Sequence, residues 1–231
     1  MTTLLIATRN RHKLEEIGAI LGAGFRFLSL QDFPEAPPVA EDQATFVRNA
    51  AKKARELARW LQSLDGFDYR VPGLNAFVLA DDSGLEVDAL QGAPGVHSAR
   101  FAAQDQRVVS VSSATVAMNS SDEANNAKLL RLLQDVPPEK RAARFRCAVA
   151  IVRVKPRQAT LAGQTFEGLC DGRIQSIGKG QGGFGYDRLF VPRGHDQSFA
   201  ELSAETKNKL SHRAQALQKV RRYLETLGLG A

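Results

Sequence analysis

Short hydrophobic runs and amphipathic stretches alternate along the first third of the chain. Residues 4–8 form an apolar run that predicts a strand, and from position 14 to 21 apolar side chains recur with the spacing of one helix face. Asn10 lies where it can cap that helix. Alternation around residues 25–27 predicts a second strand, and residues 46–61 carry the apolar stripe of a long amphipathic helix.

The rest of the chain combines longer strands with two further helices. An apolar run at residues 76–80 predicts a buried strand ending at Asp81, and Ser120 and Glu123 are spaced as a capping box before a helix. The last helix has its apolar stripe from Leu210 to Leu227 and is expected to include Lys207. Other strands are predicted at residues 144–154, 158–162, 165–170, 173–177 and 189–191, with turns at Gly163, Gly172 and Gly178. This mixture predicts a layered α/β protein with a second lobe near the middle.

Composition narrows the class of protein. With 43% hydrophobic and 24% charged residues, the 231-residue chain can bury a core without covalent staples. Cys147 and Cys170 form no CxxC pair and the four histidines are scattered, so neither a disulfide framework nor structural zinc is expected. The start lacks the apolar run of a signal peptide, and no stretch approaches the ~18 apolar residues of a membrane span. We therefore expect a cytoplasmic protein with no membrane partner.

The formal net charge of +6 suggests an anionic partner. Basic residues are interleaved with acids, and no run of five like charges occurs, which favours a local anion site over a surface that tracks a nucleic acid. A nucleic-acid-binding module is the alternative. It predicts DNA binding that falls steeply with salt while nucleoside triphosphates stay intact.

The first of four polar clusters lies between the first strand and the first helix. A strand-to-helix turn offers backbone amides to a phosphate, and side chains here add donors. An ordinary helix cap with a solvated basic turn is an equal alternative. The cluster comprises Thr8, Arg9, Asn10, Arg11, His12 and Lys13.

The second cluster, Asp81-Asp82-Ser83-Gly84, follows the buried strand. Open α/β sheets bind ligands at the carboxyl ends of their strands. Adjacent strand residues point to opposite faces, so the two acids are expected to differ: one can bind magnesium while the other orients a water. The alternative is a plain acidic turn. Glu41 is a fifth, solitary candidate, and its position by itself favours a surface acid or a helix-start charge.

The remaining clusters are a glycine-rich loop and a basic group. The loop at residues 178–187 contains GxGxxG, but a strand and not a helix follows it, so a dinucleotide fingerprint is rejected. Its Phe, Tyr and Asp side chains suit a planar base, with a flexible hairpin as the alternative. The basic group is expected at one end of a pocket, or else forms a solvated face, and comprises Lys207, His212 and Arg213.

Taken in order, these clusters resemble the inosine/xanthosine triphosphate pyrophosphatase family, a group of house-cleaning nucleotide hydrolases. The most specific match is Phe-Gly-Tyr-Asp at residues 184–187 followed by Ser-His-Arg at 211–213. A related hydrolase of modified pyrimidine triphosphates is the second alternative, against which this pair of motifs argues. All matching stretches together span almost the whole chain: residues 7–13, 41–50, 80–85, 92–101, 125–130, 182–187 and 211–213.

The resemblance implies magnesium-dependent hydrolysis of a non-standard purine nucleoside triphosphate (ITP, dITP or XTP) to the monophosphate and pyrophosphate. It implies that Asp82 is the proton acceptor and a metal-associated acid, helped by Glu41 and Asp81. The substrate contacts that it implies are Thr8 to Lys13 for the triphosphate, Ser83, Phe184, Gly185, Tyr186 and Asp187 for base and sugar, and Lys207, His212 and Arg213 for the base edge.

The resemblance also implies an architecture. The family has an elongated two-lobed α/β fold, a mixed sheet with flanking helices and the active-site cleft between the lobes, so residues 1–231 are expected to form one domain and to pair as a homodimer. Two stretches, 62–75 and 103–121, are longer than is usual in the family. Arg188 stands where the family often has Pro, and Gln43 replaces a common Gly.

Overall fold

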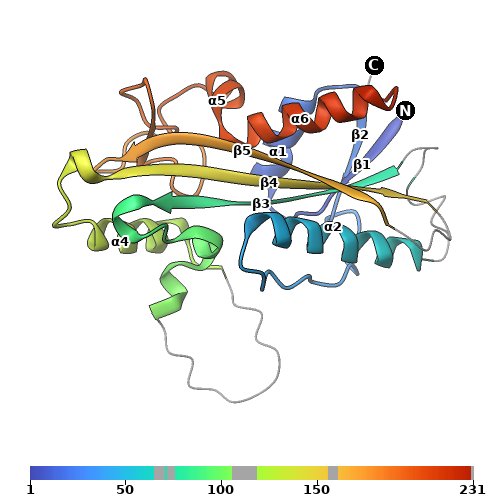
Figure 1. Ribbon diagram of the computed structural model, residues 1–231, viewed down its shortest axis with the longest axis horizontal. Helices are drawn as coiled ribbons and strands as arrows, with labels where there is room; N and C mark the ends of the chain where they lie inside the picture. The colour runs from blue at the N-terminus through green and yellow to red at the C-terminus, as the bar shows by residue number, and fades with distance from the viewer. Residues whose placement is uncertain (65–70, 72–75, 106–118, 156–160, 230–231) are drawn as a thin grey trace, which may run out of the picture. The chain divides into compact units, whose positions relative to one another are not determined.

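The computed structural model describes residues 1–64, 71, 76–105, 119–155 and 161–229. In this part of the chain six strands form one mixed sheet in the order β2-β1-β3-β4-β5-β6 (Figure 1). β1 runs parallel to both β2 and β3, whereas β5 and β6 are antiparallel. The strands are β1 (Thr2–Ile6), β2 (Phe25–Ser29), β3 (Ala76–Val87), β4 (Ala142–Val154), β5 (Gly163–Ile174) and β6 (Phe190–Pro192).

Helices flank this sheet, so the predicted mixed α/β fold is confirmed. The α-helices are α1 (Arg11–Leu21), α2 (Phe46–Gln62), α4 (Asp122–Leu132), α5 (Ala204–Leu210) and α6 (His212–Thr226). Short 3₁₀ helices are η1 (Asp88–Leu90), η2 (Gly95–Arg100), η3 (Ala102–Asp105) and η4 (Pro138–Lys140). None of the described helices is long and apolar enough to cross a membrane.

The chain divides into two compact units. The first comprises residues 1–82, 147–168 and 211–231, and the second comprises residues 83–146 and 169–210. Since β3, β4 and β5 each have residues in both ranges, the two units share three strands of the sheet.

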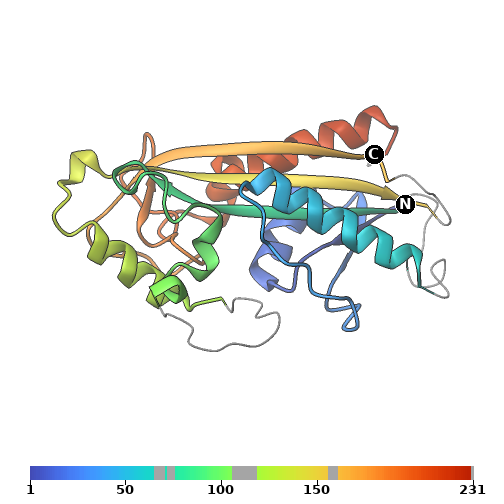
Figure 2. The same ribbon diagram turned by 60° about the horizontal axis from the view of Figure 1, so that its bottom comes forward.

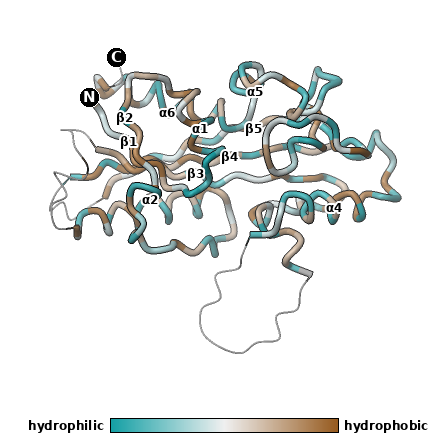
Figure 3. The backbone as a smooth tube through the Cα atoms, turned by 180° about the vertical axis from the view of Figure 1, so that it is seen from behind, coloured by the Kyte–Doolittle hydropathy of each residue, from teal (hydrophilic) through white to brown (hydrophobic). Residues whose placement is uncertain are grey.

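The first unit is built from β1, β2, the adjoining parts of the other strands and three helices. α1 and α6 contact each other on one face of the sheet, and α2 lies across the opposite face (Figures 1 and 2). Alternate strand residues supply the core beneath α1 and α6, where Leu4, Ile6, Phe77 and Leu79 are fully buried or nearly so. The brown, hydrophobic stretches at β1 and its neighbouring strands in Figure 3 mark this core.

The second unit has its own hydrophobic core around three phenylalanines. The rings of Phe145 and Phe190 lie 4.7 Å apart, and that of Phe199 lies 5.1 Å from Phe190. Leu129 and Leu133, from α4 and the residue after it, complete this cluster. Each unit therefore has the apolar contacts that hold its own strands and helices together.

Several predicted elements change in the structure. β3 does not end at Asp81 but continues to Val87, because β4 lines its other edge after β1 has ended. β5 runs unbroken through Gly172, where a turn was predicted. A Cβ atom there would lie 2.3 Å from the carbonyl oxygen of Val191, so this glycine permits the close approach of β6. The predicted strands at 165–170 and 173–177 are thus largely one strand, and the prediction at 158–162 falls mostly outside the described residues.

The helix starts also differ from the prediction at two places. Ser121, and not Ser120, caps α4, since the Ser120 hydroxyl accepts a hydrogen bond from Ala103 N instead. Lys207 does not share the last helix, because Ser211 adopts an extended conformation and caps α6 there. Asn10 caps α1 as predicted. Most of the long stretches at 62–75 and 103–121 lies outside the described residues.

Gly168 of β5 lies against the first turn of α6. A Cβ atom at this position would lie 2.0 Å from the carbonyl oxygen of His212 and 2.7 Å from the amide of Ala216, both backbone atoms that cannot rotate away. We expect Gly168→Ala to lower the free energy of unfolding by roughly 1–3 kcal/mol. Urea unfolding of the purified variant measures this.

The matched control is Gly18→Ala in the middle of α1, where nothing lies within 4 Å of the added Cβ atom. That change should raise the free energy of unfolding by roughly 0.5–1 kcal/mol, because alanine has the higher helix propensity. Equal stability of the two variants would contradict the close packing of α6 on β5.

Candidate active site

The turn between β1 and α1 holds the first predicted cluster. Thr8 Oγ1 accepts a hydrogen bond from Asn10 N at 3.0 Å, and Asn10 Oδ1 accepts one from Lys13 N at 3.2 Å. Arg9, Arg11 and His12 are exposed around this turn. The predicted helix cap is confirmed, and it leaves cationic side chains at the positive end of the α1 dipole. Phosphate binding by these residues stays a prediction.

Asp81 is buried between two cations from distant segments. Lys13 Nζ lies 3.1 Å from Asp81 Oδ2, and Arg213 Nη2 lies 3.1 Å from the same oxygen. The Arg213 guanidinium also contacts Glu16 Oε2 at 2.5 Å. Burial alone would raise the pKa of Asp81, but Lys13, Arg213 and Lys53 together hold it well below its usual range. Asp81 therefore stays ionised.

Asp82, the next residue, has very different surroundings. It is 5% exposed, and its Oδ2 atom is buried with no hydrogen-bond partner among the residues that the structure describes. Burial raises the pKa of Asp82 to about 6, and the Glu41 carboxylate adds to this effect, against Lys53, Lys13 and a hydrogen bond from Asn49. The two acids thus differ in their contacts and in the direction of their pKa shifts. That one binds magnesium while the other orients a water stays a prediction.

Lys53 on α2 is a charged residue of this region that the sequence analysis missed. Its Nζ donates to Glu41 Oε1 at 2.6 Å and to the carbonyl oxygen of Asp81 at 2.7 Å. Burial lowers the pKa of Lys53, but the carboxylates of Glu41, Asp82 and Asp81 raise it above its usual value. The available signal was its spacing, since Lys53 follows the buried Asn49 by one helical turn.

The glycine-rich loop and Lys207 form a second set of contacts, within the second unit. Asp187 Oδ2 accepts hydrogen bonds from Phe184 N at 2.9 Å and from Lys207 Nζ at 2.6 Å. The ammonium lies 5.0 Å from the centre of the Phe184 ring. Gly183 has a positive φ of 72°, and a Cβ atom there would overlap Asp187 Oδ2. The loop is thus a hydrogen-bonded turn built around the Lys207–Asp187 pair.

The predicted site residues fall into two groups. In the first unit lie the residues of the β1–α1 turn, the three acids, His212 and Arg213; in the second unit lie Ser83, the turn at 184–187 and Lys207. His212 is buried at the first position of α6. Because the Arg213 guanidinium is 2% exposed and bound by two carboxylates, its role in reading a base stays a prediction, as does that of His212.

The predicted metal site is not assembled by protein side chains alone. Among the described residues no three His, Cys, Asp or Glu side chains gather as a metal site. Asp81 is bound by Lys13 and Arg213, and Glu41 is bound by Lys53. The buried Oδ2 of Asp82 nevertheless fits magnesium, which is commonly held by one or two carboxylates together with substrate phosphates.

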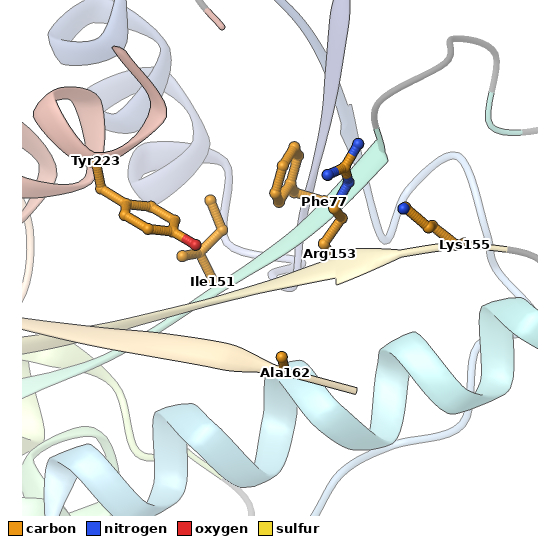
Figure 4. Close-up of a pocket in the computed structure, with 6 residues that line it drawn as sticks. All are labelled: Phe77, Ile151, Arg153, Lys155, Ala162 and Tyr223. Atoms are coloured by element: carbon orange, nitrogen blue, oxygen red, sulfur yellow. The ribbon is translucent and has the colours of Figure 1, made fainter. Parts of the chain in front are cut away.

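A pocket of about 210 Å³ in the first unit involves none of these residues (Figure 4). The guanidinium of Arg153 lies 5.9 Å from the centre of the Phe77 ring at its wall. Its lining residues are Phe77, Ile151, Arg153, Lys155, Ala162 and Tyr223.

The raised pKa of Asp82 has a consequence for stability. Its value of about 6 lies above the 3.8 of a free carboxyl, so ionised Asp82 destabilises the fold above pH 6 and has no such effect below about pH 4. We expect Asp82→Asn to raise the free energy of unfolding at pH 8 by up to about 3 kcal/mol. This is the pKa difference converted at roughly 1.4 kcal/mol per pKa unit. Urea unfolding between pH 4 and 8 measures this gain, which should vanish at low pH.

Asp81→Asn is the matched control and should behave in the opposite way. Removing its charge leaves Lys13 and Arg213 without their shared carboxylate, so the variant should lose stability at pH 8. A stability difference between Asp82→Asn and the wild type that does not change with pH would contradict the surroundings described for Asp82.

The chain matches the Ham1 family over residues 4–223. It is 45% identical over 230 residues to the dITP/XTP pyrophosphatase of Geobacter sulfurreducens, covering 99% of this chain and 100% of that protein. It is 44% identical over 225 residues to the enzyme of the same name from Desulforamulus reducens, covering 97% and 96% of the two chains.

Solved structures agree with the sequence matches. The Staphylococcus aureus Ham1 protein superposes with a TM-score of 0.73 at 31% identity, covering 98% of this chain and 100% of that chain. A dITP/XTP pyrophosphatase from Mycobacterium abscessus, at 39% identity, has a TM-score of 0.64 and coverages of 95% and 98%. Sequence and fold thus match over nearly the full length, and this chain belongs to the Ham1 family.

Proposed function

We propose that this protein hydrolyses the non-standard purine nucleoside triphosphates ITP, dITP and XTP to the monophosphate and pyrophosphate, with magnesium. The observation that carries the proposal is the pair of adjacent acids. Asp81 is neutralised by cations, and Asp82 has a buried oxygen to which none of the described residues donates a hydrogen bond. Family membership supports the reaction class, because full-length relatives are named dITP/XTP pyrophosphatases. The proposal includes a cytoplasmic homodimer, as the sequence resemblance implies.

The β1–α1 turn is proposed to bind the triphosphate. Its exposed Arg9 and Arg11, together with Lys13, offer positive charge at the N-terminus of α1. The Lys13 side chain is 19% exposed while it contacts Asp81. Part of this side chain is therefore accessible to a phosphate. Charge-assisted contacts of this kind stabilise the phosphate oxygens.

Asp82 is proposed as the general base. A water oxygen attacks the α-phosphorus, the bond from that phosphorus to the bridging oxygen breaks, pyrophosphate leaves, and Asp82 accepts the proton of the water. With a pKa of about 6 the carboxylate is ionised at neutral pH and still basic enough to take this proton. Asp81 cannot do this as well, since two cations lower its basicity.

The oxygen chemistry of Asp82 and Glu41 also suits magnesium. Asp82 Oδ2 would hold the ion. Glu41, which is paired with Lys53 and has a partly exposed side chain, would assist it. When bound, magnesium neutralises charge on the polyphosphate and makes pyrophosphate a better leaving group. Lys53 keeps the two carboxylates close by offsetting their repulsion.

The turn at residues 184–187 is proposed to hold base and sugar, with Phe184 as a stacking surface. Lys207 beside it has only donors, and inosine and xanthine carry an acceptor oxygen at position six where adenine carries an amino donor. Adenine would therefore place donor against donor. Guanine shares the six-oxygen, so we expect it to be excluded less strongly.

A panel of triphosphates tests this specificity. We expect ITP, dITP and XTP to give the highest kcat/KM for pyrophosphate release, GTP a lower value, and ATP and pyrimidine triphosphates the lowest, with discrimination of up to ~10⁴-fold from the unpaired donor. The panel also includes modified pyrimidine triphosphates. Preferential cleavage of these would identify the protein as the alternative, a hydrolase of modified pyrimidine triphosphates. Cleavage of ATP as fast as ITP would overturn the proposed substrate class.

A second test concerns Asp82 directly. Asp82→Asn should lower kcat by ~10²-fold or more, the usual scale for loss of a general base. The kcat/KM of the wild type should fall at acidic pH, where Asp82 gains a proton, and magnesium should move this fall below the pKa of about 6 that Asp82 has without the ion. This acidic limb should disappear in the variant. The matched control is Asp42→Asn, an exposed acid paired with Lys52, which should keep full activity. Normal turnover of folded Asp82→Asn would remove Asp82 from this role.

A further inference from the structure

Helix α4 binds both backbone polar groups of one residue, Gly185, in the turn at 184–187. Gly185 N donates to Asp122 Oδ2 at 2.5 Å, and the carbonyl oxygen of Gly185 accepts from Asn126 Nδ2 at 2.9 Å. Asp122 and Asn126 are four residues apart, so they lie on the same face of α4. All three residues belong to the second unit.

The orientation of the Asn126 amide follows from its partners. Asn126 Nδ2 also donates to the carbonyl oxygen of Asp122 at 2.8 Å, so both of its contacts are acceptors that require the NH₂ group. Gly185 has a positive φ of 62°, although nothing lies within 4 Å of an added Cβ atom. Glycine is needed here for its backbone conformation, and the two side chains hold that conformation.

α4 is itself fixed to the rest of the second unit. On its other side Asn125 Oδ1 accepts from Ala102 N at 2.8 Å, and Lys128 Nζ donates to the carbonyl oxygen of Phe101 at 2.7 Å. Leu129 is fully buried in the core of this unit. These contacts fix the position of α4 and, with it, the positions of Asp122 and Asn126 in the second unit.

A third contact holds the same turn from η2. The Tyr186 hydroxyl donates to the carbonyl oxygen of Ser98 at 2.8 Å, and Ser98 Oγ accepts from Leu85 N in β3. With the Lys207–Asp187 pair, three consecutive residues of the turn are anchored to separate elements. The contacts to Gly185 differ from the others because they hold the backbone itself.

We propose that Asp122 and Asn126 are positioning residues that hold the turn at 184–187 in the conformation that binds the base and sugar. This inference rests on the proposed function. If the turn samples other conformations, the apparent affinity of a ligand that needs it falls by the fraction that remains competent. Every ligand with a base should then bind more weakly by a similar factor, while pyrophosphate, which has no base, should bind as before.

The experiment compares Asp122→Ala, Asp122→Asn and Glu123→Ala. The asparagine keeps an acceptor oxygen for Gly185 N, and Glu123 is an exposed acid in the same first turn of α4. We expect Asp122→Ala to raise the KM for ITP and the inhibition constant of inosine monophosphate about tenfold, the scale of one charge-assisted hydrogen bond. Its kcat and its inhibition by pyrophosphate should stay unchanged. Glu123→Ala should resemble the wild type, and Asp122→Asn, which keeps the acceptor oxygen but not its charge, should lie between Asp122→Ala and the wild type.

Hydrogen exchange of the peptide covering residues 184–187 supplies a readout that needs no substrate. In the ligand-free protein, exchange there should be faster in Asp122→Ala and in Asn126→Ala than in Glu123→Ala. Unchanged exchange in both, or equal weakening of inosine monophosphate and pyrophosphate, would overturn the positioning role. If the wild type fails to cleave six-oxo purine triphosphates, the proposed function fails, while the exchange measurement still decides whether α4 holds the turn.

Discussion

A buried carboxylate shared by two cations organises the first unit. Asp81 on β3 binds Lys13 of α1 and Arg213 of α6, and Arg213 in turn binds Glu16 of α1. Removing Asp81 would leave the buried Arg213 with Glu16 alone and Lys13 without its carboxylate. The loss of a buried partner costs far more than an exposed ion pair gains. This network therefore ties two helices to the strand that carries the proposed general base.

The same network explains why two adjacent aspartates have opposite properties. Lys13 and Arg213 both bind Asp81 and neutralise its carboxylate. The burial of Asp82 and the Glu41 carboxylate outweigh the effects of Lys53, Lys13 and Asn49 on its pKa. Burial then works against the charge of Asp82 and makes it a better proton acceptor. The distribution of three cations thus helps to give the two neighbouring aspartates a lowered and a raised pKa.

In the second unit, hydrogen bonds and one ion pair together hold a turn in place. The turn at 184–187 is held by Lys207 through Asp187, by η2 through Tyr186 and by α4 through Gly185. Backbone groups are bonded as well as side chains, which restricts conformations that a glycine would otherwise visit. A turn held in this way can present an aromatic ring to a ligand at low entropic cost.

The sequence by itself determined the mixed α/β class, the Asn10 cap and the amphipathic helix at 46–61, because periodicity and capping depend on neighbouring residues. It also indicated that Asp81 and Asp82 would differ. Only the tertiary structure decided which acid is neutralised, since the partners of Asp81 lie 68 and 132 positions away along the chain. For the same reason the unbroken course of β5 past Gly172 depended on contact with β6. Burial and charge environment are set by residues that folding brings together, and no local pattern records them.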